Sequence, residues 1–108
     1  MQTLVQVICT KGPSLRDAIV NDPKLEVSGF AVQKKQKPGR APGWATLHSI
    51  EPDRRGALKI EWDAQTRVLL CRVVNRGKGR PHKVVGDFVD YVLAKFRHRI
   101  EAINVLPR

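Results

Sequence analysis

The chain has 108 residues, of which 42% are hydrophobic, and it carries 20 Lys and Arg against ten Asp and Glu, a formal net charge of +10. This apolar fraction is too high for a disordered chain, and no apolar run approaches the roughly 18 residues that a membrane-spanning helix needs. The length predicts one domain over residues 1–108, and the charge favours a polyanionic partner.

The first third of the chain predicts a strand, a short helix and a second strand. Residues 3–9 (TLVQVIC) are rich in strand-forming residues. Ser14 and Asp17 have the spacing of a helix capping box, and Asp22-Pro23 ends that helix because the residue before a proline avoids helical geometry. Residues 24–33 alternate well enough for a strand. The N-terminus has no basic leader, so we expect a cytoplasmic protein.

Further strands are predicted at 44–50, 57–63 and 67–75. The sequence ALKIEWD has the cleanest alternation in the chain, which directs Trp62 and its alternate neighbours inward and Lys59 outward. The last of these runs is apolar on both faces, as a central strand covered on both sides would be.

Residues 84–98 predict the main helix, and residues 99–107 a final strand. The helix has an unusually wide apolar face, made of Val84, Val85, Phe88, Val89, Val92, Leu93 and Phe96. The fold class is therefore α+β in the order β-α-β-β-β-β-α-β, an antiparallel meander covered by one major amphipathic helix plus a short N-terminal helix. Because the apolar face exceeds what one small sheet needs, we expect a homodimer packed through this helix.

No arrangement of residues predicts catalysis, a metal or a cofactor. The three histidines are scattered, and the sequence GKGRPHK lacks the spacing and the Ser/Thr of a phosphate-binding P-loop. Cys9 and Cys71 are far apart, and each lies in an apolar strand pattern, so we expect two buried, reduced thiols. The sequence predicts that the protein is not an enzyme.

Two basic segments carry the strongest functional signal. The first, KKQKPGRAPG (34–43), is followed by a tryptophan, and cations beside an aromatic ring are the parts of a single-strand binding platform. The second, NRGKGRPHK (75–83), leads into the main helix, where unpaired backbone N–H groups attract anions. The predicted nucleic-acid contacts are Lys34, Lys35, Lys37, Arg40, Trp44, Arg76, Lys78, Arg80 and Lys83. The alternatives are solvated connectors and, for Trp44, a place in the core.

A simple meander places the two basic segments at opposite ends of the sheet. Either a path across the exposed face joins them, or a dimer brings copies together. Lys59 and Arg72 project from the two strands between the segments, which gives the first route some charge.

A meander with basic loops followed by one broad helix resembles the single-stranded-DNA-binding fold of the Whirly proteins and the transcriptional positive cofactors. The sequence QKPGR (36–40) is similar to the basic turn of the latter. The resemblance covers about residues 24–98, and it implies a homodimer packed through the helix and a curved sheet that binds single strands. The strand and helix before this range and the strand after it depart from the compact cofactor pattern.

The leading prediction is a protein that binds single-stranded DNA or RNA without catalysis, such as a transcription-related regulator. One alternative is a protein–protein interaction module of a larger cytoplasmic assembly. Another is a small enzyme or sensor for a phosphorylated ligand. Salt dependence separates the first from the others, because neutralising phosphates makes log affinity fall linearly with log salt.

Overall fold

The helices and strands follow the predicted order. A computed structural model of the protein describes residues 2–10, 12–32, 44–50, 56–74 and 81–107, with only the backbone described for Gln2, Trp44 and Pro81. The strands are β1 (Gln2–Cys9), β2 (Phe30–Val32), β3 (Trp44–Ser49), β4 (Ala57–Asp63), β5 (Val68–Val74) and β6 (Ile100–Pro107). The helices are α1 (Leu15–Val20) and α2 (Pro81–Phe96), with two short 3₁₀ turns, η1 (Glu26–Ser28) and η2 (Arg97–Arg99).

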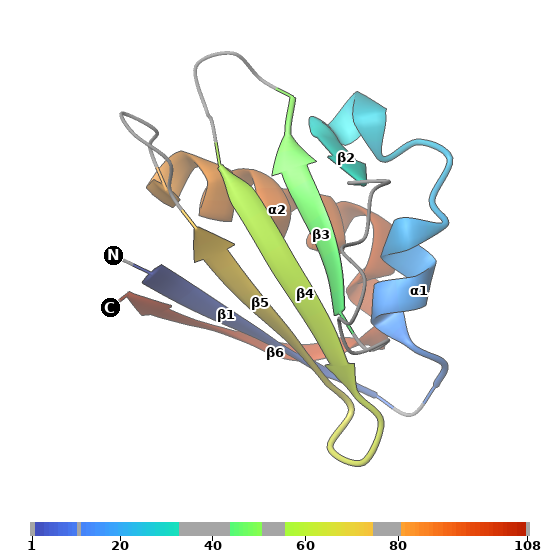
Figure 1. Ribbon diagram of the computed structural model, residues 1–108. Coiled ribbons are helices and arrows are strands. Elements are labelled where there is room, and N and C mark those ends of the chain that lie inside the picture. Colours follow the sequence, from blue (N-terminus) through green and yellow to red (C-terminus); the bar gives the residue numbers. More distant parts are fainter. Residues whose placement is uncertain (1, 11, 33–43, 51–55, 75–80, 108) are drawn as a thin grey trace.

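The six strands form one antiparallel sheet in the order β2-β3-β4-β5-β1-β6. The predicted meander supplies the first four strands, and β1 then pairs between β5 and β6. Val7 of β1 lies opposite Leu69 on one side and Ile103 on the other. The α+β class and the order of elements are therefore confirmed, and the start of β1 lies beside the end of β6 (Figure 1).

Helix α2 covers one face of the sheet (Figure 1). Alternate strand residues such as Val5, Leu58 and Leu69 are fully buried on that face, together with Phe88 and Val92 of the helix. Trp62 has the same parity as Leu58, and it packs against this core as predicted. The opposite face of the sheet points toward the viewer in Figure 1, and no helix of the described ranges lies over it.

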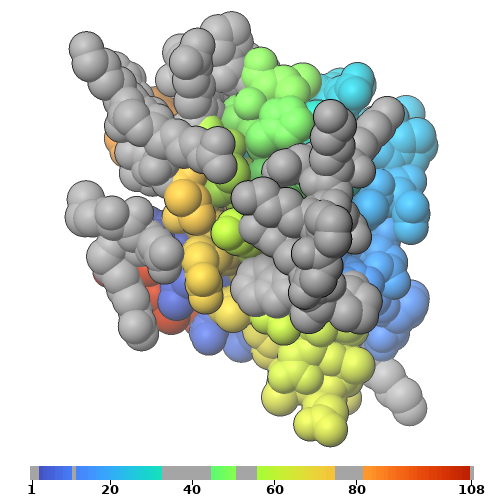
Figure 2. Space-filling model, in the orientation of Figure 1, coloured from blue at the N-terminus to red at the C-terminus, as the bar shows by residue number. Residues whose placement is uncertain are grey.

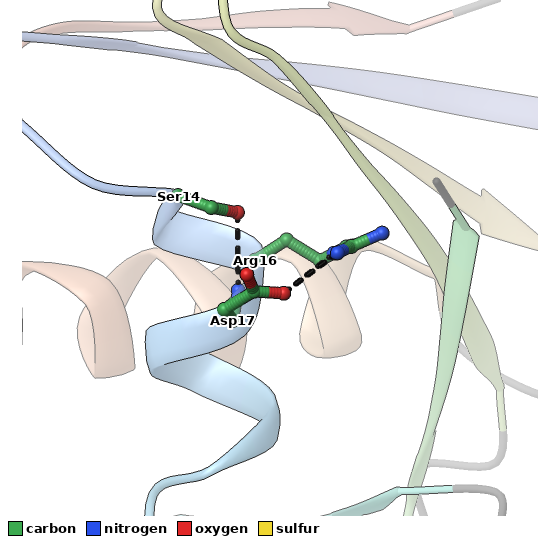
Figure 3. A network of polar contacts seen from close by, with 3 residues as sticks. All are labelled: Ser14, Arg16 and Asp17. Carbon is green, nitrogen blue, oxygen red and sulfur yellow. Dashed lines mark hydrogen bonds and ion pairs between the residues drawn. The ribbon is translucent and has the colours of Figure 1, made fainter. Parts of the chain in front are cut away.

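The short helix α1 begins as its sequence predicts. The hydroxyl of Ser14 accepts a hydrogen bond of 3.2 Å from the backbone N–H of Asp17, which satisfies one of the unpaired donors of the first turn (Figure 3). The carboxylate of Asp17 forms an ion pair of 2.6 Å with Arg16. Leu15 and Ile19, four residues apart and hence on one side of the helix, are buried in the main core.

The strand predicted for residues 24–33 is correct only in its last part. Residues Glu26–Ser28 form a 3₁₀ turn, which ends at Gly29 with a φ of 95° in the left-handed region. Strand β2 begins directly afterwards at Phe30. Glycine adopts this backbone conformation at little cost, so Gly29 lets the chain turn into β2.

The apolar face of α2 packs almost entirely within the protein. Of the residues predicted to form it, Val84, Val85, Phe88 and Val92 are buried, and Val89 and Phe96 pack against the same core. Leu93 is 37% exposed. One sheet, together with α1, is therefore wide enough to cover this face, and the width of the face no longer argues for a dimer. None of the helices described is long and apolar enough to cross a membrane.

Candidate nucleic-acid interface

The sheet face opposite α2 carries a row of side chains that crosses four strands. Thr46 of β3 lies opposite Lys59 of β4, Lys59 lies opposite Arg72 of β5, and Arg72 lies opposite Leu4 of β1. All four side chains are half-buried and alternate with core residues along their strands. We call this surface the open face, and Figure 2 views it directly, with atoms of β1 and β5 at the surface.

Two cations thus lie directly opposite each other near the middle of the sheet. Side chains at directly paired positions of an antiparallel sheet have Cβ atoms about 4.5–5.5 Å apart, and like charges there are destabilising. Glu61 is two residues from Lys59 on the same strand and hence on the same face. An anion bound over Lys59 and Arg72 could contact both side chains at once.

A hollow of about 500 Å³ opens on the same face, at the end of the sheet near the β4–β5 turn. Its walls include the polar side chains of Gln6, Glu61 and Thr66 and the apolar side chain of Leu70. Glu61 lies opposite Leu70, and Leu70 lies opposite Gln6, so the wall is a second row across the strands. The open face therefore combines cations, hydrogen-bonding groups and apolar surface.

Most of the predicted contacts lie outside the described residues. These are Lys34, Lys35, Lys37, Arg40, Arg76, Lys78 and Arg80. The backbone of Trp44 begins β3 and pairs with Glu61, and its side chain is not described. Lys83 is exposed in the first turn of α2, where the described side chains include no acid.

The positive charge is concentrated in the segments that join the described parts. Eleven of the 20 Lys and Arg residues, but only two of the ten Asp and Glu residues, belong to these segments and the chain ends. The described residues therefore hold nine cations and eight acids and are nearly neutral. The excess charge is a property of connections and not of the helices and strands.

The strand registers show where the basic segments are attached. Trp44, which follows segment 33–43, pairs with Glu61 near one end of β4. Val74, which precedes segment 75–80, pairs with Ala57 at the other end of β4. The attachment points thus lie at opposite ends of the sheet, as the meander predicts, and Lys59 and Arg72 lie between them.

A second arginine-bearing segment is attached beside the segment 75–80. Gly56 follows residues 51–55, which include Arg54 and Arg55. A Cβ atom at Gly56 would be 3.3 Å from Val84 of α2 and 3.5 Å from the carbonyl oxygen of Val74. Arg54 and Arg55 are not among the predicted contacts, although two adjacent arginines are a visible signal in the sequence.

Lys59 and Arg72 were also left out of the predicted contacts. They are single charges within strands, and the sequence does not show that the two strands pair them directly. Their parity is the signal that places them on the path between the basic segments, because both alternate with buried apolar residues and must therefore point away from the core.

The described residues show no arrangement for metal binding or thiol chemistry. They contain no group of three or more His, Cys, Asp or Glu side chains that could hold a metal ion. Cys9 and Cys71 are free and buried, as expected, and burial raises the pKa of both thiols. A thiol with a raised pKa is a poor nucleophile at neutral pH.

Comparison of the chain with protein-family models, with curated proteins and with solved structures gives no match. The resemblance to the Whirly proteins and the positive cofactors stays a prediction.

Proposed function

We propose that this protein binds single-stranded nucleic acid across the open face of its sheet, in the cytoplasm and without catalysing a reaction. The observation that carries the proposal is the direct pairing of Lys59 with Arg72 on that face. Two cations that face each other on neighbouring strands can both donate charge-assisted hydrogen bonds to one phosphate.

The distribution of the remaining charge supports a chain-like ligand over a compact one. Basic segments are attached at both ends of the sheet, with Lys59 and Arg72 between them. A nucleic-acid backbone that runs between the two attachment points would pass Lys59 and Arg72. A small phosphorylated ligand would use only one end.

The chemistry of the open face favours a single strand over a duplex. Leu4 and Leu70 are half-buried on the same face as the cations, and Gln6 supplies an amide in the wall of the hollow. Unpaired bases present flat apolar faces and free hydrogen-bonding edges, which such a mixed surface accommodates. A duplex presents mainly phosphates and needs an element that enters a groove.

A transcription-related role and a homodimer through residues 84–98 belong to this proposal as consequences of the family resemblance. The described apolar side chains of α2 offer little surface for such a dimer, since Leu93 is the one large hydrophobic among them with more than a third of its surface exposed. A dimer through the helix would therefore have to form around Leu93.

The test is the salt dependence of binding when the facing pair is removed. The double variant Lys59→Gln, Arg72→Gln keeps the aliphatic stems, and far-UV circular dichroism verifies its fold. Each lost phosphate contact reduces the slope of log affinity against log salt by about 0.7 for a single strand, so two lost contacts predict a reduction of about 1.4. Fluorescence anisotropy with one labelled oligonucleotide measures both slopes.

The matched control is Lys95→Gln, Arg97→Gln, which removes two exposed cations at the end of α2. Its net charge equals that of the test variant, so any effect of total charge is the same in both. We expect the control to keep the slope of the wild type. Equal slopes in the two variants would contradict binding at the open face, and a flat wild-type response would instead favour the protein–protein interaction module.

A further inference from the structure

Strand β6 forms an open edge of the sheet. It is the last strand in the sheet order and pairs with β1 alone among the strands described. It is also long, with eight residues from Ile100 to Pro107, and no helix covers its outer side in Figure 1. Such an edge presents a row of backbone N–H and C=O groups that can pair with another strand.

The composition of β6 does not protect this edge. Its sequence IEAINVLP contains one acid and no Lys or Arg, although the chain has 20 of them. Proteins commonly place lysines on exposed edges to prevent strand pairing. The protective residues lie at the two ends of the strand, Glu101 near its start and Pro107 at its end.

Exposed apolar side chains accompany the edge. Val105 of β6 is 45% exposed on the face that α2 covers elsewhere, and Leu93 of α2 is 37% exposed. Tyr91 of α2 packs against Phe30 of β2, so this side of the helix faces β2. Leu93 is two residues further along, which is a rotation of about 200° around the helix axis. Leu93 therefore lies on the opposite side of α2, toward β6. Apolar surface therefore adjoins unpaired backbone at the same side of the protein.

We propose that β6 pairs antiparallel with β6 of a second copy of this chain. The two sheets become one continuous sheet with a twofold axis perpendicular to it. This arrangement keeps α2 of both copies on one side and both open faces on the other. The inference does not depend on nucleic-acid binding, and it is an alternative to a homodimer through residues 84–98.

The sequence of β6 selects the register of this pair. Directly paired residues lie on one face of the sheet, so a twofold pair must be centred on a single residue that faces its own copy. A centre at Asn104 places Ile103 opposite Val105 and Ala102 opposite Leu106. A centre at Ile103 would instead place the Glu101 carboxylate opposite Val105.

This self-complementarity argues for a second copy as the partner. In the register centred on Asn104, the apolar residues of β6 meet apolar residues on both faces, and the two Asn104 amides can hydrogen-bond each other across the axis. Glu101 faces only the terminal Pro107. An unrelated strand would need the same pattern by chance.

The first measurement is the mass in solution by sedimentation equilibrium at micromolar concentrations. We expect a dimer for the wild type and a monomer for Val105→Lys, which adds a charge to the edge. Val27→Lys is the matched control, because Val27 is 87% exposed in η1, remote from β6 in the sheet order, and its variant stays dimeric. Because each copy carries a charge of +10, added salt strengthens the dimer, the opposite of its effect on nucleic-acid binding.

The second measurement tests the register and holds even if Val105→Lys folds poorly. In the register proposed, the Cα atoms of the two residues at position 104 are about 4.5–5.5 Å apart, which suits a disulfide. Asn104→Cys is then expected to form a covalent dimer under mild oxidation, and Glu101→Cys is not. Cys9 and Cys71 are buried and do not compete.

Three results would overturn the proposal. One is a wild type that stays monomeric at micromolar concentrations. Another is equal cross-linking of the two cysteine variants. The third is a dimer that persists in Val105→Lys while Asn104→Cys fails to cross-link, which would move the interface to the helix 84–98.

Discussion

Removing the hydroxyl of Tyr91 is expected to weaken the attachment of α2 to the connection after α1. Tyr91 is buried, and its hydroxyl donates a hydrogen bond of 2.7 Å to the carboxylate of Asp22. Its ring also lies 6.4 Å from that of Phe30 and 6.0 Å from that of Phe96. Tyr91→Phe keeps these ring contacts and removes only the hydrogen bond.

The size of the effect follows from the charge of the acceptor. A hydrogen bond to a charged group contributes about 1.5–3 kcal/mol, and the partly exposed Asp22 regains water when the bond is lost, so we expect about 1.5 kcal/mol. With an unfolding entropy of about 2.1 cal/mol/K per residue, this loss lowers the melting temperature by roughly 6–7 °C. Urea denaturation at pH 7 gives the free energy of unfolding directly.

The pH dependence provides an internal check. Burial alone would raise the pKa of Asp22, but the Tyr91 hydroxyl, the Lys24 backbone N–H and the nearby lysines outweigh it and lower that pKa. A lowered pKa stabilises the fold above the ordinary value of 3.8, and this stabilisation is lost as the pH falls through the native pKa. The difference between the wild type and Tyr91→Phe therefore shrinks below about pH 4.

At alkaline pH, the stability that Tyr91 contributes is lost as the pH rises, in contrast to the contribution of Asp22. Burial, and secondly the Asp22 carboxylate, raise the pKa of Tyr91 above its ordinary value of 10.0. The native wild type then holds this proton longer than the unfolded chain, so the contribution of Tyr91 to stability is lost above about pH 10. Tyr91→Phe lacks this loss, whereas the two buried thiols weaken both proteins alike at high pH. Two results would contradict this prediction. One is a difference in the free energy of unfolding between the wild type and Tyr91→Phe below about 0.5 kcal/mol at pH 7, and the other is a difference that is the same at about pH 3 as at pH 7. A double-mutant cycle with Asp22→Asn isolates the coupling between the two residues.

Four further changes test other parts of the account. Ser14→Ala removes the helix cap and should cost about 1 kcal/mol in urea denaturation, whereas Ser14→Asp retains it. Gly29→Ala forces a side chain into left-handed backbone and should cost about 1–2 kcal/mol by the same assay. Trp44→Ala should weaken single-strand binding by about 1–3 kcal/mol and abolish the quenching of tryptophan fluorescence by bases; a lower melting temperature with unchanged affinity would place Trp44 in the core. Changing Lys78 and Arg80 together to Gln should reduce the salt slope by about 1.4, and an unchanged slope would make that segment a solvated connector.

The parts of the fold that depend on local sequence were predictable. The alternation of ALKIEWD, the spacing of Ser14 and Asp17 and the periodicity of the main helix are each set by neighbouring residues, and each appears in the structure. The structure of residues 24–29 was not predictable, because their apolar residues alternate as in a strand although they form a 3₁₀ turn that ends at a left-handed glycine. The insertion of β1 between β5 and β6 was also out of reach, since it joins segments from opposite ends of the chain.

The candidate site also has one part that the local sequence predicts and one part that depends on the fold. Composition alone marks the basic segments at 34–43 and 75–83. The facing pair of Lys59 and Arg72 depends on the register of β4 and β5, which the turn after Asp63 fixes. In that turn the Asp63 carboxylate accepts hydrogen bonds from the backbone N–H groups of Gln65 and Thr66, and Arg67 has a φ of 57°. The pairing of Lys59 with Arg72 therefore follows from the register of the two strands, which the sequence of either strand alone does not give.

Binding of the wild-type protein to single-stranded and duplex forms of one labelled oligonucleotide, from about 50 to about 200 mM salt, tests the central claim most directly. If about five phosphates are neutralised along the open face and its flanking segments, log affinity for the single strand falls linearly with log salt with a slope near −3.5. The account predicts this slope together with tighter binding of the single strand than of the duplex at every salt concentration. An affinity that does not change with salt, or a consistent preference for the duplex, would contradict it.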